Sequence, residues 1–245
     1  MRTDDFDYDL PQELIAQEPA AVRDACRLLK MDRATGALED RIFHDVGDYL
    51  RPGDLLVANE TRVMPARLLG AKRGTGGAAE VFLLREVFGR EPKTGSSALW
   101  ETLVRPGRRL KPGAVVDFTD ASGEVVLSAE VIDWVEDKGD GGKGERLVRL
   151  TTPLPSLEAL HAVGHTPLPP YIKDYAGDEE LYQTVYSTRE RSAAAPTAGL
   201  HFTPELIDQL KQKGVRWETV ELEVGLDTFR LVDEDDPEKH KIHTE

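Results

Sequence analysis

The chain has 245 residues, of which 40% are hydrophobic and 31% charged, and its formal net charge at pH 7 is -14. These values are those of a globular protein with room for one large or two modest domains, and they exclude a largely disordered chain. The acidic N-terminus lacks the apolar run of a signal peptide, and no stretch approaches about 20 apolar residues, so we expect a cytoplasmic protein with no membrane span.

The first predicted element of the chain is a β-hairpin. Arg27 to Met31 and Leu38 to Phe43 have strand-like composition, and Gly36 supplies the positive φ that the turn requires. Cys26, just before the hairpin, is the only cysteine. It excludes an internal disulfide and a multi-cysteine zinc site, and it is either a packed small residue or a reactive thiol beside Arg27.

An apolar run of buried-strand type, Leu55 to Ala58, follows the hairpin and leads into the polar residues 59–62. Open α/β sheets place their ligand contacts at such strand ends. The alternative interpretation is that Glu60 and Arg62 form a local ion pair.

From Leu68 onward the pattern changes to short alternating strands separated by glycine-rich turns. Regularly spaced strands of this kind predict a small β-barrel or sandwich inserted into an α/β framework. The predicted strands are Ala79 to Leu84, Leu99 to Val104, Ala114 to Phe118, Glu124 to Val135 and Arg146 to Leu150. We therefore predict an α/β fold with two domains: a discontinuous α/β domain of residues 1–67 and 153–245, and an inserted antiparallel β-barrel domain of residues 68–152.

The acidic chain contains a basic region. The segment from Arg62 to Lys111 has eleven basic and four acidic residues, so its net charge is +7. Its sharpest cluster lies on a predicted turn of the insert and consists of Arg105, Arg108, Arg109 and Lys111. The overall charge argues against a general nucleic-acid coat protein, but this cluster is either a phosphate-binding surface or an ordinary solvated charged face.

After the insert, a helix is predicted from Leu157 to Val163, followed by a proline-rich extended strap that ends at Ile172. A second helix has strong start signals: Thr203 is a good N-cap and Pro204 suits the first helical position. Its apolar face and C-terminal stop are formed by Leu206, Ile207, Leu210 and Gly214, and a strand from Val215 to Val224 follows.

The loop from Ala194 to Phe202, directly before this helix, is the strongest candidate site. Its small residues let a ligand approach the backbone closely, and the free N–H groups at the helix start can receive an anion. The alternative is an ordinary tight connection that carries a surface histidine, His201.

Several segments of this chain resemble those of a known enzyme family. The Ala194 to Thr203 loop is similar to the most distinctive segment of the S-adenosylmethionine:tRNA ribosyltransferase-isomerases of queuosine biosynthesis. The same resemblance extends to residues 17–19, 23–29, 59–67, 164–172, 182–186 and 225–230. The chain departs from the family pattern at Glu60, Ala58, Glu223, Asp227 and Leu231, and the family's sequences continue further at the C-terminus.

This resemblance implies an enzyme that moves the ribosyl unit of S-adenosylmethionine onto 7-aminomethyl-7-deazaguanine at the tRNA wobble position. The ribosyl unit is isomerised, epoxyqueuosine-tRNA forms, and adenine and methionine are released. S-adenosylmethionine is then a co-substrate, tRNA carrying the modified base is the partner, and no metal or redox cofactor is required. We expect a monomer.

The resemblance also suggests roles for individual residues. His201 or Glu60 is the base that removes a proton beside the sulfonium, and Arg62 binds the methionine carboxylate. Asn59 and Thr61 hold adenine or ribose hydroxyls, and Tyr171, Tyr182 or Phe229 stacks on the wobble base. Further substrate contacts are expected from Pro196, Thr197, Ala198, Gly199, Leu200, Phe202, Gly225 and Thr228, and tRNA contacts from Arg105, Arg108, Arg109 and Lys111.

Two other classes of function remain open. The departures from the family pattern favour a non-catalytic or truncated tRNA-binding paralogue, which would bind RNA without releasing adenine. An unrelated small-molecule transferase that uses the same loop would turn over without RNA.

Overall fold

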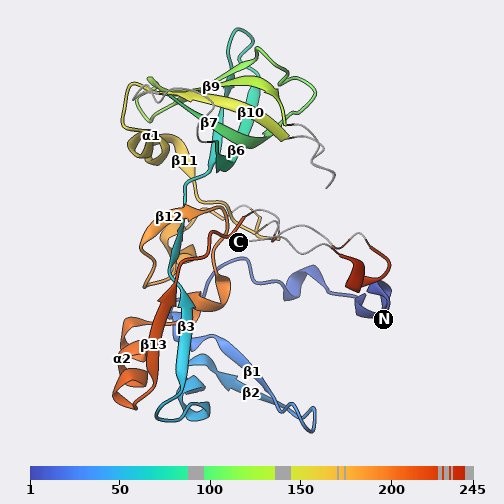
Figure 1. The fold of residues 1–245 in the computed structure, drawn as a ribbon, viewed down its shortest axis with the longest axis vertical. Coiled ribbons are helices and arrows are strands. Elements are labelled where there is room, and N and C mark those ends of the chain that lie inside the picture. Colours follow the sequence, from blue (N-terminus) through green and yellow to red (C-terminus); the bar gives the residue numbers. More distant parts are fainter. Residues whose placement is uncertain are drawn as a thin grey trace. The chain divides into compact units, whose positions relative to one another are not determined.

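The computed structural model describes residues 1–87, 97–135, 145–169, 171–173, 175–225, 228, 232 and 234–240. The chain divides into two compact units, one made of Met1–Val63 with Leu168–Glu245 and the other of Met64–Pro167. The fold is mixed α/β and includes a closed six-stranded antiparallel β-barrel. Figure 1 labels its elements.

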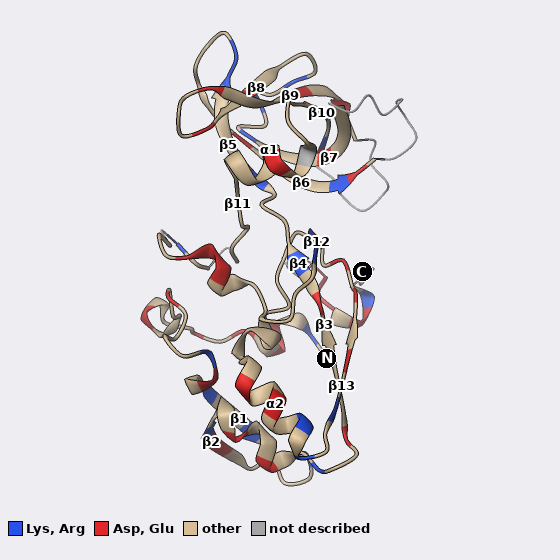
Figure 2. Cartoon of the chain, turned by 90° about the vertical axis from the view of Figure 1, so that its left-hand side faces the viewer, with Lys and Arg blue, Asp and Glu red and all other residues tan. Residues whose placement is uncertain are grey.

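The discontinuous unit, Met1–Val63 with Leu168–Glu245, is built from short elements. Its strands are β1 (Arg27–Met31), β2 (Leu38–Ile42), β3 (Leu55–Asn59), β4 (Thr61–Val63), β12 (Arg189–Ser192) and β13 (Arg216–Val220). Its α-helix is α2 (Pro204–Gln212), and its 3-10 helices are η1 (Thr3–Phe6), η2 (Gln12–Leu14), η3 (Arg23–Ala25), η4 (Phe43–Tyr49), η5 (Glu179–Tyr182), η6 (Thr197–His201) and η8 (Pro237–Lys239). Acidic and basic residues both occur at scattered positions along these elements (Figure 2).

The predicted hairpin and the predicted second helix are both confirmed. β1 and β2 pair antiparallel, and Gly36 has a φ of 70° in the turn. The Thr203 hydroxyl accepts a hydrogen bond from the Leu206 amide at 3.1 Å, and Pro204 begins α2. Leu206 and Leu210 pack with Phe43 in a small core, as the apolar spacing predicts.

Two parallel strand pairs form the centre of this unit. β3 pairs with β13, and β4 pairs with β12. Figure 1 shows β3 and β13 lying side by side. At the junction of β3 and β4, the Glu60 amide donates to the Val220 carbonyl and the Thr188 amide donates to the Glu60 carbonyl, both at 2.9 Å. The chain therefore changes its pairing partner at Glu60, from β13 on the β3 side to β12 on the β4 side.

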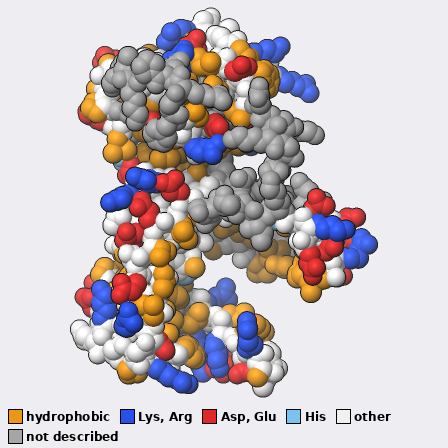
Figure 3. All heavy atoms as spheres, in the orientation of Figure 1, with side chains coloured by type: hydrophobic (Ala, Val, Ile, Leu, Met, Phe, Trp, Pro, Cys, Tyr) orange, Lys and Arg blue, Asp and Glu red, His pale blue; other side chains and the backbone are white. Residues whose placement is uncertain are grey.

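β3 is less buried than its apolar sequence predicts. Leu55 and Val57 are 46% and 57% exposed, whereas Leu56 packs against the α2 core. In the described part of the chain β3 pairs only with β13, so α2 covers one face of the pair and the alternate residues stay at the surface. Hydrophobic side chains are visible on the surface in Figure 3.

The second unit, Met64–Pro167, is a barrel with the strand order β5-β6-β7-β10-β9-β8, closed by pairing of β5 with β8. The strands are β5 (Arg67–Lys72), β6 (Ala78–Glu86), β7 (Ser97–Arg105), β8 (Val115–Thr119), β9 (Val125–Trp134) and β10 (Glu145–Thr151). The predicted strands are therefore present, and β5 and the short β11 (Gly164–His165), which pairs with β5, are additional.

Closure of the barrel depends on a glycine. A Cβ atom on Gly70 of β5 would lie 2.4 Å from the Asp117 carbonyl oxygen and 2.6 Å from the Phe118 ring. No other residue fits this seam without moving the backbone. Inside the barrel, alternate residues such as Val81, Phe118 and Val148 have no exposed surface, which is the period-two pattern of a half-buried strand.

Helix α1 (Ser156–Val163) packs on the barrel. Ala159, Leu160 and Val163 belong to the same apolar core as the barrel strands. The compact barrel unit thus extends beyond the predicted insert of residues 68–152 at both ends. The division into an inserted domain and a discontinuous α/β domain stays a prediction.

Candidate active site

The loop before α2 contains a 3-10 turn, η6. The Gly199 amide donates to the Pro196 carbonyl at 2.8 Å, and the Phe202 amide donates to the Gly199 carbonyl at 3.3 Å. His201 is the last residue of η6, and the α2 cap at Thr203 follows almost directly. The small residues let the chain turn tightly here, and they place the imidazole between the turn and the helix.

His201 packs at one end of a row of aromatic rings. Its ring centroid lies 5.1 Å from that of Phe43, which is 5.0 Å from Phe202. Phe202 is in turn 5.1 Å from Trp217 of β13. Contacts of this kind fix ring orientation as well as burying apolar area. The position of His201 is therefore coupled to the core beneath α2.

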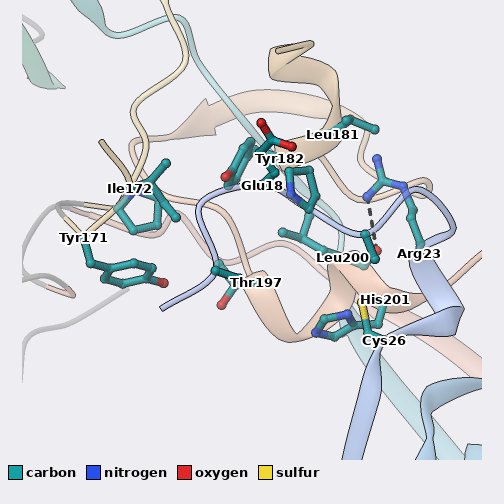
Figure 4. A pocket seen from close by; sticks show the side chains of 14 residues that line it. Glu18, Arg23, Cys26, Tyr171, Ile172, Leu181, Tyr182, Thr197, Leu200 and His201 are labelled. Atoms are coloured by element: carbon teal, nitrogen blue, oxygen red, sulfur yellow. Dashed lines mark hydrogen bonds between the residues drawn. The ribbon is translucent and has the colours of Figure 1, made fainter. Parts of the chain in front are cut away.

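His201 lines a cavity of about 200 Å³ within this unit. The cavity has mostly apolar walls with a few polar groups, which is the usual composition of a small-molecule site. It is lined by Ala16, Glu18, Pro19, Ala20, Arg23, Cys26, Pro169, Tyr171, Ile172, Leu181, Tyr182, Thr197, Leu200 and His201. Figure 4 shows Tyr171 and Ile172 on one side of the cavity and labels His201 and Cys26 among the residues that line it.

Five of the predicted site residues meet in this cavity: Tyr171, Tyr182, Thr197, Leu200 and His201. They come from the strap, from η5 and from η6, which are separate in the sequence. Tyr182 is only 8% exposed, and burial raises the pKa of its phenol. Its contacts with a substrate, like those of the other four residues, stay predictions.

One wall of the cavity comes from the N-terminal segment, to which the sequence analysis assigned no site residue. Arg23 holds this segment in place, because its guanidinium donates to the Leu200 carbonyl at 3.1 Å and to the Glu180 carbonyl at 3.2 Å. Figure 4 shows the bond from Arg23 to Leu200. Gln17 donates to the Tyr171 carbonyl at 3.1 Å and accepts from the Lys173 amide at 2.9 Å. In the sequence, the family resemblance of residues 17–19 and 23–29 was the signal that could have indicated this wall of the cavity.

Arg62 already has carboxylate partners in the structure. Its Nη1 and Nη2 atoms contact the two Glu180 oxygens at 2.9 and 2.5 Å, and its Nε lies 3.5 Å from Glu190. The hydrogen bond that Arg62 donates to Glu180 is the main cause of the raised pKa of Arg62. Among the described residues, these glutamates rather than Glu60 are its ion-pair partners. A methionine carboxylate would have to displace Glu180.

Asn59 and Thr61 have partners within the fold. The Asn59 side chain donates to the Leu222 carbonyl and accepts from the Leu222 amide, each at 3.1 Å. Thr61 is 1% exposed, and its hydroxyl lies 2.6 Å from that of Ser192. These bonds join β3 and β4 to the segments beside them. The predicted ligand contacts of both residues remain untested.

The other predicted site residues are not among those that line the cavity. Pro196, Ala198, Gly199 and Phe202 lie in or beside η6, Glu60 is the half-buried junction of β3 and β4, and Gly225 and Thr228 follow β13. Phe229, with Asp227 and Leu231, falls outside the described residues. In the barrel unit, the four basic candidates Arg105, Arg108, Arg109 and Lys111 are all exposed.

Comparison with known proteins identifies the family. Residues 3–245 match a family described as queuosine biosynthesis protein. The chain belongs to this family. Among its curated relatives, the S-adenosylmethionine:tRNA ribosyltransferase-isomerase of Dehalococcoides mccartyi (strain CBDB1) is 47% identical over 245 residues, which are 100% of this chain and 66% of the relative. The enzyme of that name from Symbiobacterium thermophilum is 49% identical over 247 residues, 100% of this chain and 67% of the relative.

The chain thus spans about two thirds of the length of these queuosine biosynthesis relatives. Among solved structures, an S-adenosylmethionine tRNA ribosyltransferase from Thermotoga maritima is 35% identical and matches with a TM-score of 0.34, covering 89% of this chain and 58% of that one.

In the described ranges, no group of three or more His, Cys, Asp or Glu side chains is arranged to hold a metal ion. None of the helices in the described part of the chain has the length and apolarity of a membrane-spanning helix.

Proposed function

We propose that this chain performs the family's reaction, the transfer and isomerisation of the ribosyl unit of S-adenosylmethionine onto 7-aminomethyl-7-deazaguanine in tRNA. The observation that carries the proposal is the cavity, which gathers five of the residues predicted to contact substrate from three separate segments. The names of relatives at 47% and 49% identity support it. The products are epoxyqueuosine-tRNA, adenine and methionine.

The chemistry requires a base, an acid and a means to bind the amino-acid end of the donor. The sulfonium acidifies the ribose carbon next to it, so a positioned base removes that proton while adenine leaves and takes up a proton. His201 lines the cavity and is our first candidate for the base, and Glu60 is the alternative. Arg62 would bind the methionine carboxylate only after exchange with Glu180. The proposed reaction transfers no electrons to or from a cofactor, so we propose that it uses no redox cofactor.

Other predicted residues have proposed roles in binding the tRNA and in shaping the site. Tyr171, half exposed at the cavity, is suited to stack on an extruded wobble base. Pro196, Ala198, Gly199 and Phe202 would shape the loop. We further propose that the chain acts as a monomer, with the barrel as an inserted domain that contacts tRNA through Arg105, Arg108, Arg109 and Lys111.

The direct test is release of adenine from S-adenosylmethionine, measured by chromatography with tRNA that carries 7-aminomethyl-7-deazaguanine. Unmodified tRNA and the free base serve as controls. Adenine release that depends on the modified tRNA supports the proposal. Tight tRNA binding with no adenine release would identify a binding paralogue instead, and turnover without RNA would identify another kind of transferase.

The basic turn gives a prediction for RNA binding. Arg108→Ala and Arg109→Ala should each weaken tRNA binding, because each removes an exposed cation. The slope of log affinity against log salt should fall by about one unit for each lost phosphate contact. Binding of S-adenosylmethionine should change little, since its proposed site lies in the other unit.

Arg85→Ala is the matched control for these two variants. Arg85 is also exposed in the barrel unit, but it is paired with Glu101 at 2.7 Å. Filter binding across a salt series measures all three variants. If Arg108→Ala and Arg109→Ala show the same slope as Arg85→Ala and wild type, this turn is not part of the RNA-binding surface.

A further inference from the structure

The turn between β7 and β8, residues 105–113, carries basic side chains that the protein does not neutralise. Among the described residues, no carboxylate lies within salt-bridge distance of Arg105, Arg108, Arg109 or Lys111. Four other arginines of the same unit are paired with acids: Arg67, Arg73, Arg85 and Arg149. Within the described part of this unit, positive charge with no carboxylate nearby is therefore concentrated at this turn and at Lys72 beside it.

Three carbonyl groups of this turn accept hydrogen bonds from cationic side chains of the barrel. The Gly107 and Leu110 carbonyls accept hydrogen bonds from the Arg146 guanidinium at 3.2 and 3.3 Å. The Arg109 carbonyl accepts from the Lys72 ammonium at 2.9 Å. The negative ends of these peptide dipoles are thus occupied by cations of the barrel. At these three positions, an anion that approaches the turn meets a carbonyl oxygen that is already bound to a cation.

Arg146 of β10 is the central residue of this arrangement. It is 2% exposed, and its guanidinium carbon lies 3.2 Å from the centre of the Trp134 ring, on which it stacks. Burial lowers the pKa of Arg146, which reflects the loss of hydration around the charge. A buried charge is expensive, and well-packed apolar residues often serve stability as well or better. Two of the hydrogen bonds that compensate this charge go to the Gly107 and Leu110 carbonyls, which points to a role in shaping the turn.

We propose that Arg146 is a positioning residue that builds residues 105–111 into a docking surface for the phosphate backbone of RNA. Being buried, Arg146 does not itself reach a phosphate. It holds the turn so that Arg105, Arg108, Arg109 and Lys111 project together into solvent, with Lys72 supporting the same backbone. The proposal rests on the proposed function for its choice of partner, a tRNA. It adds to that function the residue that shapes the surface.

The test compares Arg146→Lys and Arg146→Met for binding to a tRNA transcript across a salt series. Lysine keeps the positive charge, but it lacks the planar fork that stacks on Trp134 while it donates to two carbonyls. We expect both variants to lose one or two phosphate contacts, so the salt slope should fall by about one to two units. Arg146→Lys with the slope and affinity of wild type would overturn the proposal, because charge alone would then suffice.

Folding and partner class need their own controls. Thermal melting of each variant shows whether the barrel is intact. If both Arg146 variants unfold, Lys72→Met, which removes a donor from the rim of the turn, should still weaken RNA binding; unchanged binding in that variant would count against the proposal. Arg85→Ala again controls for the loss of one charge.

Competitors distinguish the possible occupants of the surface. At matched ionic strength, displacement of the transcript by another RNA but not by inorganic phosphate or poly-glutamate supports a phosphodiester surface. Equal displacement by poly-glutamate would reveal a general polyanion or acidic-protein site, and equal displacement by inorganic phosphate a site for free phosphate. Either result overturns the proposal. RNA binding that responds to Arg146 in a protein that releases no adenine would defeat the proposed function alone.

Discussion

His201→Ala is expected to reduce adenine release by about 10²- to 10⁴-fold, the usual contribution of general acid-base catalysis. Binding of S-adenosylmethionine should change little, because the imidazole is proposed to act on the transition state. Single-turnover assays with the modified tRNA measure the rate, and calorimetry measures binding. The variant also loses the ring contact with Phe43, so the melting temperature must be recorded alongside.

His44→Ala is the matched control for His201→Ala. His44 belongs to the same unit and follows Phe43 directly, but its side chain is 57% exposed beside Asp45. It should keep wild-type turnover. Glu60→Gln tests the alternative base. If folded His201→Ala turns over within a few-fold of wild type while Glu60→Gln is strongly impaired, the base is Glu60.

Local elements were predictable from the sequence because their signals are local. Thr203, Pro204 and the apolar spacing after them define α2 without reference to the rest of the chain. Gly36 and its flanking residues define the hairpin in the same way. The strand β5 was missed because Arg67 to Lys72 lacks a clear alternation, and its place in the barrel depends on the seam at Gly70.

The site was less predictable because its contacts join distant segments. The loop signal at residues 194–203 drew attention to His201, Leu200 and Thr197, which line the cavity, and their roles stay predictions. The pairing of Arg62 with Glu180 and the anchoring of residue 23 on the Leu200 carbonyl link positions more than 100 residues apart. No local pattern specifies such partners. Side chains at a strand end were predicted to face ligand. Thr61 bonds to Ser192 of β12 and Asn59 bonds to Leu222, and the ligand contacts of both residues stay predictions.

The second large effect is expected from Gly199→Ala. A Cβ atom at this position would lie 2.0 Å from the Tyr186 hydroxyl oxygen, which is far inside van der Waals contact. Either the Tyr186 ring or the turn η6 would have to shift. Because Trp217 packs against that ring, we expect the turn to move and to displace Leu200 and His201 with it. A displacement of about 1 Å in a catalytic group can lower the rate about 10²-fold. We therefore expect adenine release to fall by about that factor.

Removal of the obstructing oxygen should restore the function. In Gly199→Ala combined with Tyr186→Phe, the nearest remaining neighbours of the new methyl group are the Thr184 methyl carbon at 3.1 Å and the Tyr186 ring carbon at 3.2 Å. Small side-chain shifts accommodate such distances. Adenine release by the double variant should therefore recover to within about tenfold of the wild-type rate. A double-mutant cycle over the two single variants and the double variant gives the coupling energy between positions 186 and 199.

Two control variants show whether the contact between Gly199 and the Tyr186 hydroxyl fixes the position of η6. Tyr186→Phe alone should stay within a few-fold of wild type, because Trp217, 5.2 Å from the Tyr186 ring, still packs against it. Gly77→Ala, where the nearest neighbour of the added methyl group is 3.7 Å away in the barrel unit, should be silent. If the double variant is as impaired as Gly199→Ala, the Tyr186 hydroxyl is not what fixes η6. Recovery would instead establish that Tyr186, through Gly199, sets the wall of the cavity that carries His201.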